Sequence, residues 1–520
     1  MPLLIRVLSI ALIGSLAEVG SAQAHAYGER YDLPVPLWLN LVGGAAVVVL
    51  SFVIAALLLS SAGMTKTPRA RRSLLSEAGL QARAWRMIVT TARVLSVCLL
   101  ALAVLTGFFG KIDFSRNAAP TIVWAMGWVG LAFACALVGN VWLVLNPWLA
   151  LFDAAQALWK KLTGSARLSL ALPYPEAVGI FPGILLMVGF VWFMLASGVA
   201  GEPFAIAAML TIYSAVTWTG MMLFGPAIWI ARGEIFTLIA IILGRFAPIE
   251  LRSGDVRSCL QVGCPPDAEQ GCSDCPAAFY ASRRGLREVN LRPYGAGLVV
   301  ARPLSASMTI LVVMVLALVS FEGLMDTAQW IDLMVALGEY EYSDGIHAPL
   351  KTTLLFVTAT GLLYGIFYVV SALMRHLGYA DAKKAGGIRL RTTAEVMGLF
   401  VLSLVPIALA YHIAHYLYWF ATNIQYVIPA ASDPFAWGWN LFGARDYIPN
   451  RTAVSLAVIW HTAVAAIVIG HVVGVWVAHR VALMTFHTRR SAFASQIPML
   501  VLMVAYTMSS LWMLAQPIMG

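Results

Sequence analysis

Long apolar stretches, separated by short polar connections, run through almost the whole chain. Ten of these stretches are close to the ~20 residues that an α-helix needs to cross a hydrocarbon core. Because a lipid-exposed backbone must satisfy its own hydrogen bonds, we predict an all-α fold, a polytopic transmembrane helical bundle. The spans are expected at about 36–61, 87–110, 121–145, 177–200, 205–231, 306–325, 351–374, 395–420, 452–478 and 494–516.

A shorter apolar run lies ahead of the first span. It follows Arg6 and ends before Ala22-Gln23-Ala24, the small-x-small pattern that signal peptidase accepts. This predicts a cleaved signal peptide, residues 1–24, and a mature chain that begins at His25. The free amine and imidazole of His25 could together chelate a metal such as copper. Cleavage after Ala26, or no cleavage, is the alternative.

The basic residues predict the orientation of the helices. An exported N-terminus makes the odd-numbered connections cytoplasmic, and Lys and Arg gather in cytoplasmic connections. The connections after the first, third, seventh and ninth spans obey this rule, whereas acidic residues follow the sixth span, which ends outside. We therefore expect ten helices after the signal peptide, with both mature ends periplasmic (N-out/C-out), in a bacterial inner membrane.

Composition supports a membrane protein and changes how the net charge is interpreted. The chain is 60% hydrophobic and 11% charged, and its mean hydropathy is +0.82, which excludes an ordinary soluble domain. The net charge of +9 is explained by the orienting loops, so no nucleic-acid partner is expected. Membrane lipids are the expected surroundings. Two helical blocks (25–231 and 306–520) flank a cytoplasmic connection that contains cysteines (232–305).

Histidines in the eighth and ninth spans are the main candidates for chemistry. His412 and His415 are three residues apart and share a helix face. Because these spans run in opposite directions, His412, His415 and His461 are expected roughly 8–14 Å below the periplasmic surface. Three imidazoles at one depth predict a divalent metal site, zinc or copper. Alternatively, they are interhelical hydrogen-bonding groups partnered by nearby tyrosines or carbonyls.

Other residues could extend or replace this site. His471 lies about 15 Å deeper than His461 on a similar face, and this stacking also suits axial ligands of two b-type haems. His479 is expected near the cytoplasmic end. Asp433, in the aromatic-rich loop 423–450, could reach the top of the histidine site, although aromatic residues are also ordinary membrane anchors.

Four cysteines lie in the connection between the fifth and sixth spans. Cys259, Cys264, Cys272 and Cys275 form the pattern C-x4-C-x7-C-x2-C. In a reducing compartment such thiols favour metal ligation over disulfides. Proline follows two of them, which is typical of ferredoxin-type ligation, while four thiolates also suit zinc. We expect an iron–sulfur cluster or zinc, with free structural cysteines as the alternative.

Two blocks of sequence carry a resemblance. The first begins with His412-Ile-Ala-His415-Tyr, continues through residues 433–443 and reaches His461 and Gly470-His471; the second is residues 25–38. Together they resemble the bacterial membrane-protein family labelled fenitrothion hydrolase. The resemblance implies a membrane component that hydrolyses an organophosphorus triester and works with a second protein. A lipophilic small molecule would be its substrate.

These observations leave three functions open. A hydrolase would use a histidine-bound metal to polarise the phosphoryl group and activate water. A transmembrane electron-transfer protein would use haem and the iron–sulfur centre. A transporter or metal-delivery protein would use the histidines to carry its cargo.

Overall fold

The computed structural model describes residues 23–26, 29–32, 36–58, 72–76, 80–261, 272–282, 286–337, 347–380, 390–486 and 488–516. These residues include ten helical segments long and apolar enough to cross a membrane, which confirms a multi-pass helical membrane protein. The spans are Leu37–Leu57, Arg83–Phe109, Ala118–Leu137, Glu176–Ala196, Pro203–Phe224, Ala306–Met325, Pro349–Gly378, Thr393–Ser432, Leu456–Thr485 and Arg489–Leu514. The predicted signal peptide lies almost entirely outside the described residues, so its cleavage stays a prediction.

The chain forms two compact units that interleave along the sequence. The first, unit 1, contains residues 1–67, 298–419 and 452–520, and the second, unit 2, contains 68–297 and 420–451. This division differs from the two sequential blocks expected from the span order. The reason is packing: the first spanning helix, α2 (Leu37–Leu58), lies against the last two spanning helices of the chain.

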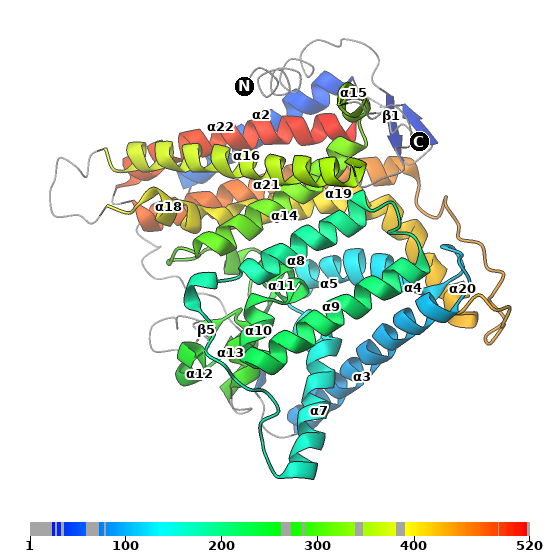
Figure 1. Cartoon of the computed structure of the whole chain (residues 1–520). Coiled ribbons are helices and arrows are strands. Elements are labelled where there is room, and N and C mark those ends of the chain that lie inside the picture. The colour runs from blue at the N-terminus through cyan, green and yellow to red at the C-terminus, as the bar shows by residue number, and fades with distance from the viewer. Residues whose placement is uncertain are drawn as a thin grey trace. The chain divides into compact units, whose positions relative to one another are not determined.

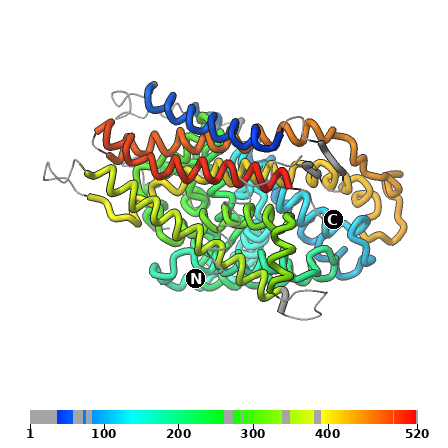
Figure 2. Tube along the Cα trace, turned by 90° about the horizontal axis from the view of Figure 1, so that it is seen from above, coloured from blue at the N-terminus to red at the C-terminus, as the bar shows by residue number. Residues whose placement is uncertain are grey.

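Unit 1 is a bundle of long helices. It contains α2, α14 (Ala306–Met325), α15 (Ala328–Ala336), α16 (His347–Gly378), α18 (Thr393–Phe400), the 3-10 turn η7 (Val401–Leu404), most of α19 (Val405–Asn423), α21 (Leu456–Thr485) and α22 (Arg489–Leu514), with a short hairpin of β1 (Gln23–Ala26) and β2 (Glu29–Asp32). Helix α22 packs against α2, α16 and α21 (Figure 1). Figure 2 shows α22 in red beside α2 in blue.

Helix α19 is held closely against α21. Its first residues, from Val405 to His412, are all buried. A Cβ atom at Gly470 of α21 would lie 2.4 Å from the Cβ of Ala410 and 2.6 Å from the carbonyl oxygen of Pro406. Glycine therefore permits this close approach, as small residues commonly do between membrane helices.

Unit 2 combines the remaining spanning helices with a small sheet that the sequence analysis did not predict. The helices are α3 (Leu80–Phe109), α4 (Ala118–Pro120), the π-type turn η2 (Thr121–Gly130), α5 (Leu131–Leu137), α6 (Trp142–Leu145), α7 (Pro147–Thr163), α8 (Phe181–Val191) with η4 (Trp192–Ala196), α9 (Pro203–Phe224), α10 (Pro226–Arg232), α11 (Ile235–Gly244), α12 (Val256–Gln261), α13 (Pro276–Ala281), and η8 (Ile424–Tyr426) with α20 (Val427–Ser432). Short η3 (Glu176–Val178) and η6 (Ala296–Leu298) complete it.

The sheet lies among the polar connections and is antiparallel. Its strands are β3 (Arg72–Ser76), β4 (Ile249–Ser253), β5 (Cys272–Ser273) and β6 (Arg287–Leu291), in the order β3-β6-β4-β5. Arg292, at the end of β6, is buried and donates to the carboxylates of Glu250 (3.3 Å) and Asp274 (2.6 Å) and to the carbonyl oxygen of Gly244 at the end of α11 (2.8 Å). These charge-assisted bonds join the sheet to the helices.

The pairing of β3 with β6 constrains how often the chain crosses the membrane. Helices α10 and α11 meet at a bend of 69° and are apolar enough to count as an eleventh span. Four spans separate β3 from this pair, so β3 and the start of α10 lie on one side. A further crossing would place β6 opposite β3, which their hydrogen-bonded pairing excludes. We infer that α10 and α11 form a re-entrant pair.

A second set of contacts gives the same result. The amide of Lys111 donates to the carbonyl oxygen of Phe435, and the amide of Ala118 donates to that of Pro434. Loops that are hydrogen-bonded to each other must lie on the same side of the membrane, so an even number of crossings separates them. Six spans do so, and a crossing by α10 and α11 would raise the number of crossings to seven. We name the side of these loops the outer side; the charge bias predicts that it is periplasmic.

Topology reporters test the re-entrant pair. Reporters fused after Arg72, Lys161 and Arg257 should all report one compartment, predicted to be the cytoplasm, because an even number of crossings separates them. Fusions after Ile112 and Gly443 should report the other compartment. Opposite signals at Arg72 and Arg257 would show that α10 and α11 cross the membrane.

Candidate functional site

A buried carboxyl group lies near the outer end of α14. Glu322 is the single acidic residue of that helix, and only 4% of its surface is exposed. Its Oε1 accepts a hydrogen bond of 2.7 Å from the hydroxyl of Tyr416 in α19. Its Oε2 is buried and has no hydrogen-bond partner among the residues that the structure describes. An acid within a spanning helix indicates function, because burying it is unfavourable.

Two of the predicted histidines join this carboxyl group. His412 and His415 lie on α19 with Tyr416, and their ring centroids are 4.8 Å and 4.7 Å from that of Tyr416. The spacing of three and four residues places the three side chains on one face. His412 is buried. Both imidazoles of α19 therefore adjoin one tyrosine ring, on the helix face that their spacing predicted them to share.

The cluster reaches the helix end through a second acid. The Nδ1 atom of His415 lies 3.8 Å from Oδ2 of Asp326, which follows α14 directly. Burial raises the pKa of the Asp326 carboxyl to about 6, while 41% of its side chain remains exposed. Glu322, Asp326, His412, His415 and Tyr416, which we name the outer cluster, thus extend from the bundle interior to its outer edge.

Close contact between α14 and α19 fixes the cluster in place. A Cβ atom at Gly323 would lie 1.8 Å from the hydroxyl oxygen of Tyr411. Tyr411 is buried and its ring lies 6.5 Å from the ring of His415, stacked nearly parallel. The absence of a side chain at Gly323 therefore lets α19 present its polar face directly to α14.

His461 does not join the outer cluster. It lies on the exposed stripe of α21, and its Nδ1 atom is 2.6 Å from the carbonyl oxygen of Ala457 in its own helix. The depth estimate ignored helical phase: Ala463 faces the core, and a residue two positions away points roughly 200° from it. The expected convergence of His412, His415 and His461 is thus not found.

Asp433 and His25 are two further residues predicted to bind a metal in the membrane. Within the described part of the chain, no three His, Cys, Asp or Glu side chains are placed to hold one metal ion. The carboxylate of Asp433 accepts from the amides of Trp437 (2.9 Å) and Gly438 (2.7 Å) and so organises its own loop. The side chain of His25 lies outside the described residues. We derive no chemistry through a metal at this site.

Two further histidines are buried in α21. The Nδ1 atom of His471 lies 2.8 Å from the carbonyl oxygen of Ile467, and Nδ1 of His479 lies within hydrogen-bond distance of the Gln496 side-chain amide. The Nε2 atoms of both have no hydrogen-bond partner among the described residues. His479 is expected near the cytoplasmic end of its span. Its side chain is buried against Phe52 and is not exposed at the membrane surface.

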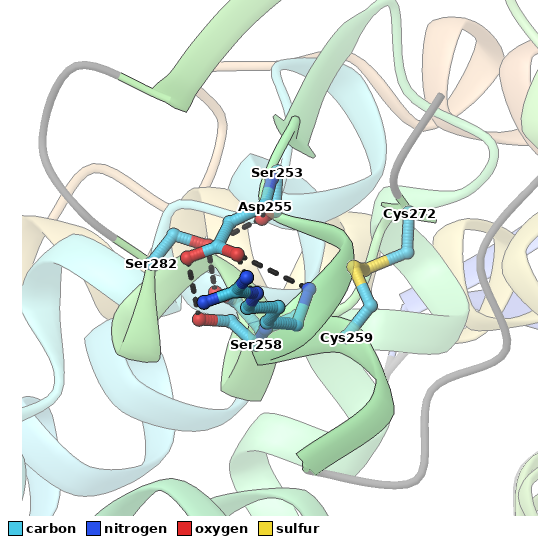
Figure 3. Close-up of a disulfide and its surroundings, with 8 residues drawn as sticks. Ser253, Asp255, Ser258, Cys259, Cys272 and Ser282 are labelled. Carbon is cyan, nitrogen blue, oxygen red and sulfur yellow. Dashed lines mark hydrogen bonds between the residues drawn. A yellow bond between two sulfur atoms is a disulfide. The ribbon is translucent and has the colours of Figure 1, made fainter. Parts of the chain in front are cut away.

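The cysteines lie in the polar part of unit 2. Cys259 of α12 and Cys272 of β5 form a disulfide, and both are buried. Figure 3 shows this bond beside the turn that Asp255 organises by accepting from Ser258. Cys275 and apolar residues of α10 pack against the buried cluster that Cys259 and Cys272 form with Ala277 and Ala278.

This arrangement bears on the predicted cytoplasmic metal. The disulfide occupies two of the four thiols, and Cys264 lies outside the described residues. A four-thiolate centre requires that bond to be reduced. Iron–sulfur or zinc ligation by these residues therefore stays a prediction, and the structure instead has Cys259 and Cys272 joined in a disulfide, which the sequence analysis did not expect.

Sequence reasoning missed a second buried acid. Glu234 lies at the bend between α10 and α11 and is fully buried. Its oxygens accept from Tyr213 (2.5 Å), Trp142 (2.8 Å) and Asn146 (3.1 Å), and from the amides of Phe236 and Thr237 at the start of α11. The position of Glu234 between two apolar stretches of sequence was the feature that could have indicated this site. Because both oxygens are fully hydrogen-bonded, Glu234 acts as a structural cap.

Comparisons of the chain with protein-family models, with curated proteins and with solved structures give no match. The resemblance to the fenitrothion hydrolase family thus stays a prediction, and the function must be argued from the residues.

Substitution of Gly323 tests the contact that positions the cluster. Gly323→Ala should destabilise the protein by about 1–3 kcal/mol, because its Cβ collides with Tyr411. Thermal unfolding in detergent measures the effect, and Tyr411→Phe should recover part of the lost stability. Gly361→Ala in α16, where a Cβ meets nothing within 4 Å, is the control. Equal stability of the two alanine variants would contradict the contact.

Proposed function

We propose that this protein moves protons or couples to their movement across the membrane, with Glu322 as the proton-binding group. The observation that carries the proposal is the state of the Glu322 carboxyl: it is buried inside a spanning helix, and one of its oxygens has no protein partner among the described residues. Intramembrane carboxyl and imidazole groups that face a bundle interior are typical of proton relays in transporters.

The physical argument concerns the charge of the carboxyl. A buried carboxylate without compensating bonds is strongly unfavourable, so such a group is more stable when it holds a proton. Tyr416 donates to Glu322 and stabilises the carboxylate in part, which lowers the barrier to releasing the proton. Burial favours the protonated carboxyl, and the bond from Tyr416 favours the carboxylate. Since neither form is fully favoured, Glu322 can bind and release a proton.

The outer cluster provides an entrance for the proton. Asp326 is partly exposed and lies 3.8 Å from His415, and the rings of His415 and His412 both adjoin that of Tyr416. Carboxylates and neutral imidazoles both accept protons. A proton taken up at Asp326 can therefore move through the imidazoles toward Glu322.

Unit 2 adds a feature that favours a transporter. Helices α10 and α11 are broken by 69°, and discontinuous helices are common in transporters, where they line the path of the cargo. The polar cap at Glu234 satisfies the N-terminus of α11. The cargo, a second protein component and the location in a bacterial inner membrane stay predictions.

Replacement of Glu322 tests the proposal. Purified protein in liposomes that contain a pH-sensitive dye should dissipate an imposed pH gradient, and Glu322→Gln should slow this flux at least tenfold because the amide cannot take up a proton. Glu176→Gln, the same change at an exposed site before α8, should leave the flux unchanged. Wild-type flux in Glu322→Gln, or no flux in the wild type, would refute the proposal.

The acidity of Asp326 predicts how the flux depends on pH. Its pKa is raised to about 6, so the carboxyl becomes protonated as the outer pH falls through 6. The initial flux should rise as the outer pH is lowered toward 6 and level off below it, where the site is saturated. Asp326→Asn should lower the flux, and the flux should no longer reach a plateau below pH 6. An unchanged profile would show that protons enter elsewhere.

Hydrolysis is the second candidate, and one observation favours it. The imidazole–carboxylate pair of His415 and Asp326 lies at the outer helix end, where lipophilic esters partition, and a histidine oriented by a carboxylate is a usual general base for water. Release of 4-nitrophenol from a 4-nitrophenyl phosphotriester, lost in His415→Ala but kept in Glu322→Gln, would favour hydrolysis over proton transport.

A further inference from the structure

A second polar group lies deeper in unit 1 than the outer cluster. His471 of α21 is 1% exposed, and its Nδ1 atom lies 2.8 Å from the carbonyl oxygen of Ile467. A carbonyl oxygen accepts only, so Nδ1 must carry the proton of the neutral ring. The Nε2 atom then presents an unprotonated lone pair, buried and without a hydrogen-bond partner among the described residues.

Two hydroxyl groups accompany this imidazole. The ring of Tyr506 in α22 lies 6.1 Å from the ring of His471. The hydroxyl of Tyr506 is hydrogen-bonded to that of Ser320 in α14. The Ser320 hydroxyl also donates to the carbonyl oxygen of Leu316 (2.7 Å). Ser320, Tyr506 and His471, which we name the inner group, thus bring together from three helices three groups that can each accept a proton.

The inner group continues the outer cluster toward the opposite surface. At 1.5 Å per residue, Ser320 lies about 8 Å from the outer end of α14, Tyr506 about 12 Å from that of α22, and His471 about 22 Å from that of α21. Glu322 is about 5 Å from the outer end of α14 by the same measure. The polar groups therefore occupy successive depths.

Helix α14 connects the two sets of residues. Glu322 faces α19, where it meets Tyr416, and Ser320 faces α22, where it meets Tyr506. Ser320 and Glu322 point roughly 200° apart around α14, and the Tyr411 hydroxyl lies at Gly323, whose direction falls between the two.

We propose that His471 is the next proton-binding site after Glu322 on one route through unit 1, with Tyr506 and Ser320 as its relay. This rests on the proposed function. In the step, the Glu322 carboxyl loses a proton and becomes a carboxylate, and Nε2 of His471 gains one and becomes part of an imidazolium ring. The bond of Nδ1 to Ile467 is kept, because Nδ1 donates in both forms of the ring.

The test compares two histidines of one helix. His471→Gln should reduce the liposome proton flux at least tenfold, because its amide cannot take up a proton. His461→Gln removes an imidazole with the same bond to its own helix but on the exposed stripe, and it should retain the wild-type flux. Tyr506→Phe, which removes only the hydroxyl, should also reduce the flux. Wild-type flux in both His471→Gln and Tyr506→Phe would overturn the inference.

The two proposals fail in different ways. If Glu322→Gln loses the flux while His471→Gln and Tyr506→Phe keep it, the route does not pass through the inner group but the proposed function stands. If Glu322→Gln keeps the flux, the proposed function is wrong. Nitrogen-15 spectra of histidine-labelled protein measure the protonation of each ring nitrogen directly, and a variant is needed only to assign the His471 signals. On acidification, Nε2 of His471 should become protonated while Nδ1 stays protonated. A lone-pair Nε2 that never titrates would contradict the inference.

Discussion

The hydrogen-bonded pairing of β3 with β6 is the constraint from which the membrane topology follows. It joins a strand that precedes four spans to a strand that follows them, so it fixes the parity of the crossings between. That parity makes α10 and α11 a re-entrant pair, and it places the ends of α14 and α19 and the start of α21 on the outer side. The depths of Glu322 and His471 are meaningful only because of this assignment.

Two buried glutamates, one in each unit, differ in how many hydrogen-bond donors surround them. Glu234 is surrounded by amide, indole and hydroxyl donors at a helix N-terminus, so both of its oxygens are hydrogen-bonded. Glu322 accepts a hydrogen bond from Tyr416 at Oε1, and its Oε2 has no partner in the part of the chain that the structure describes. The Glu322 carboxyl is thus less completely compensated than that of Glu234, and this difference is what the proposed function rests on.

The sequence predicted features that depend on length and composition, and it failed where helical phase or long-range pairing decides. Ten apolar runs were enough to find ten spans, because a bilayer sets the length of each helix. The spacing of His412 and His415 indicated a shared face. The error at His461 arose because depth does not determine which way a side chain points. The sheet was missed because β3 is five residues long and its partner lies over two hundred residues away. Glu322 is the lone acid of the sixth span, but its bond to Tyr416 depends on the packing of α14 against α19, which no local pattern predicts.

The cysteines raise a question of chemistry that the topology sharpens. The β3–β6 pairing places them on the side of the basic first connection, which the charge bias predicts to be cytoplasmic. In that compartment a disulfide is normally reduced. The predicted metal and the disulfide of Cys259 and Cys272 exclude each other, because a thiol that is oxidised to a disulfide cannot act as a thiolate ligand. Ala227 and Ile228 of α10 pack against the cluster that contains the disulfide, so this polar part of unit 2 is joined to the re-entrant pair through apolar contacts.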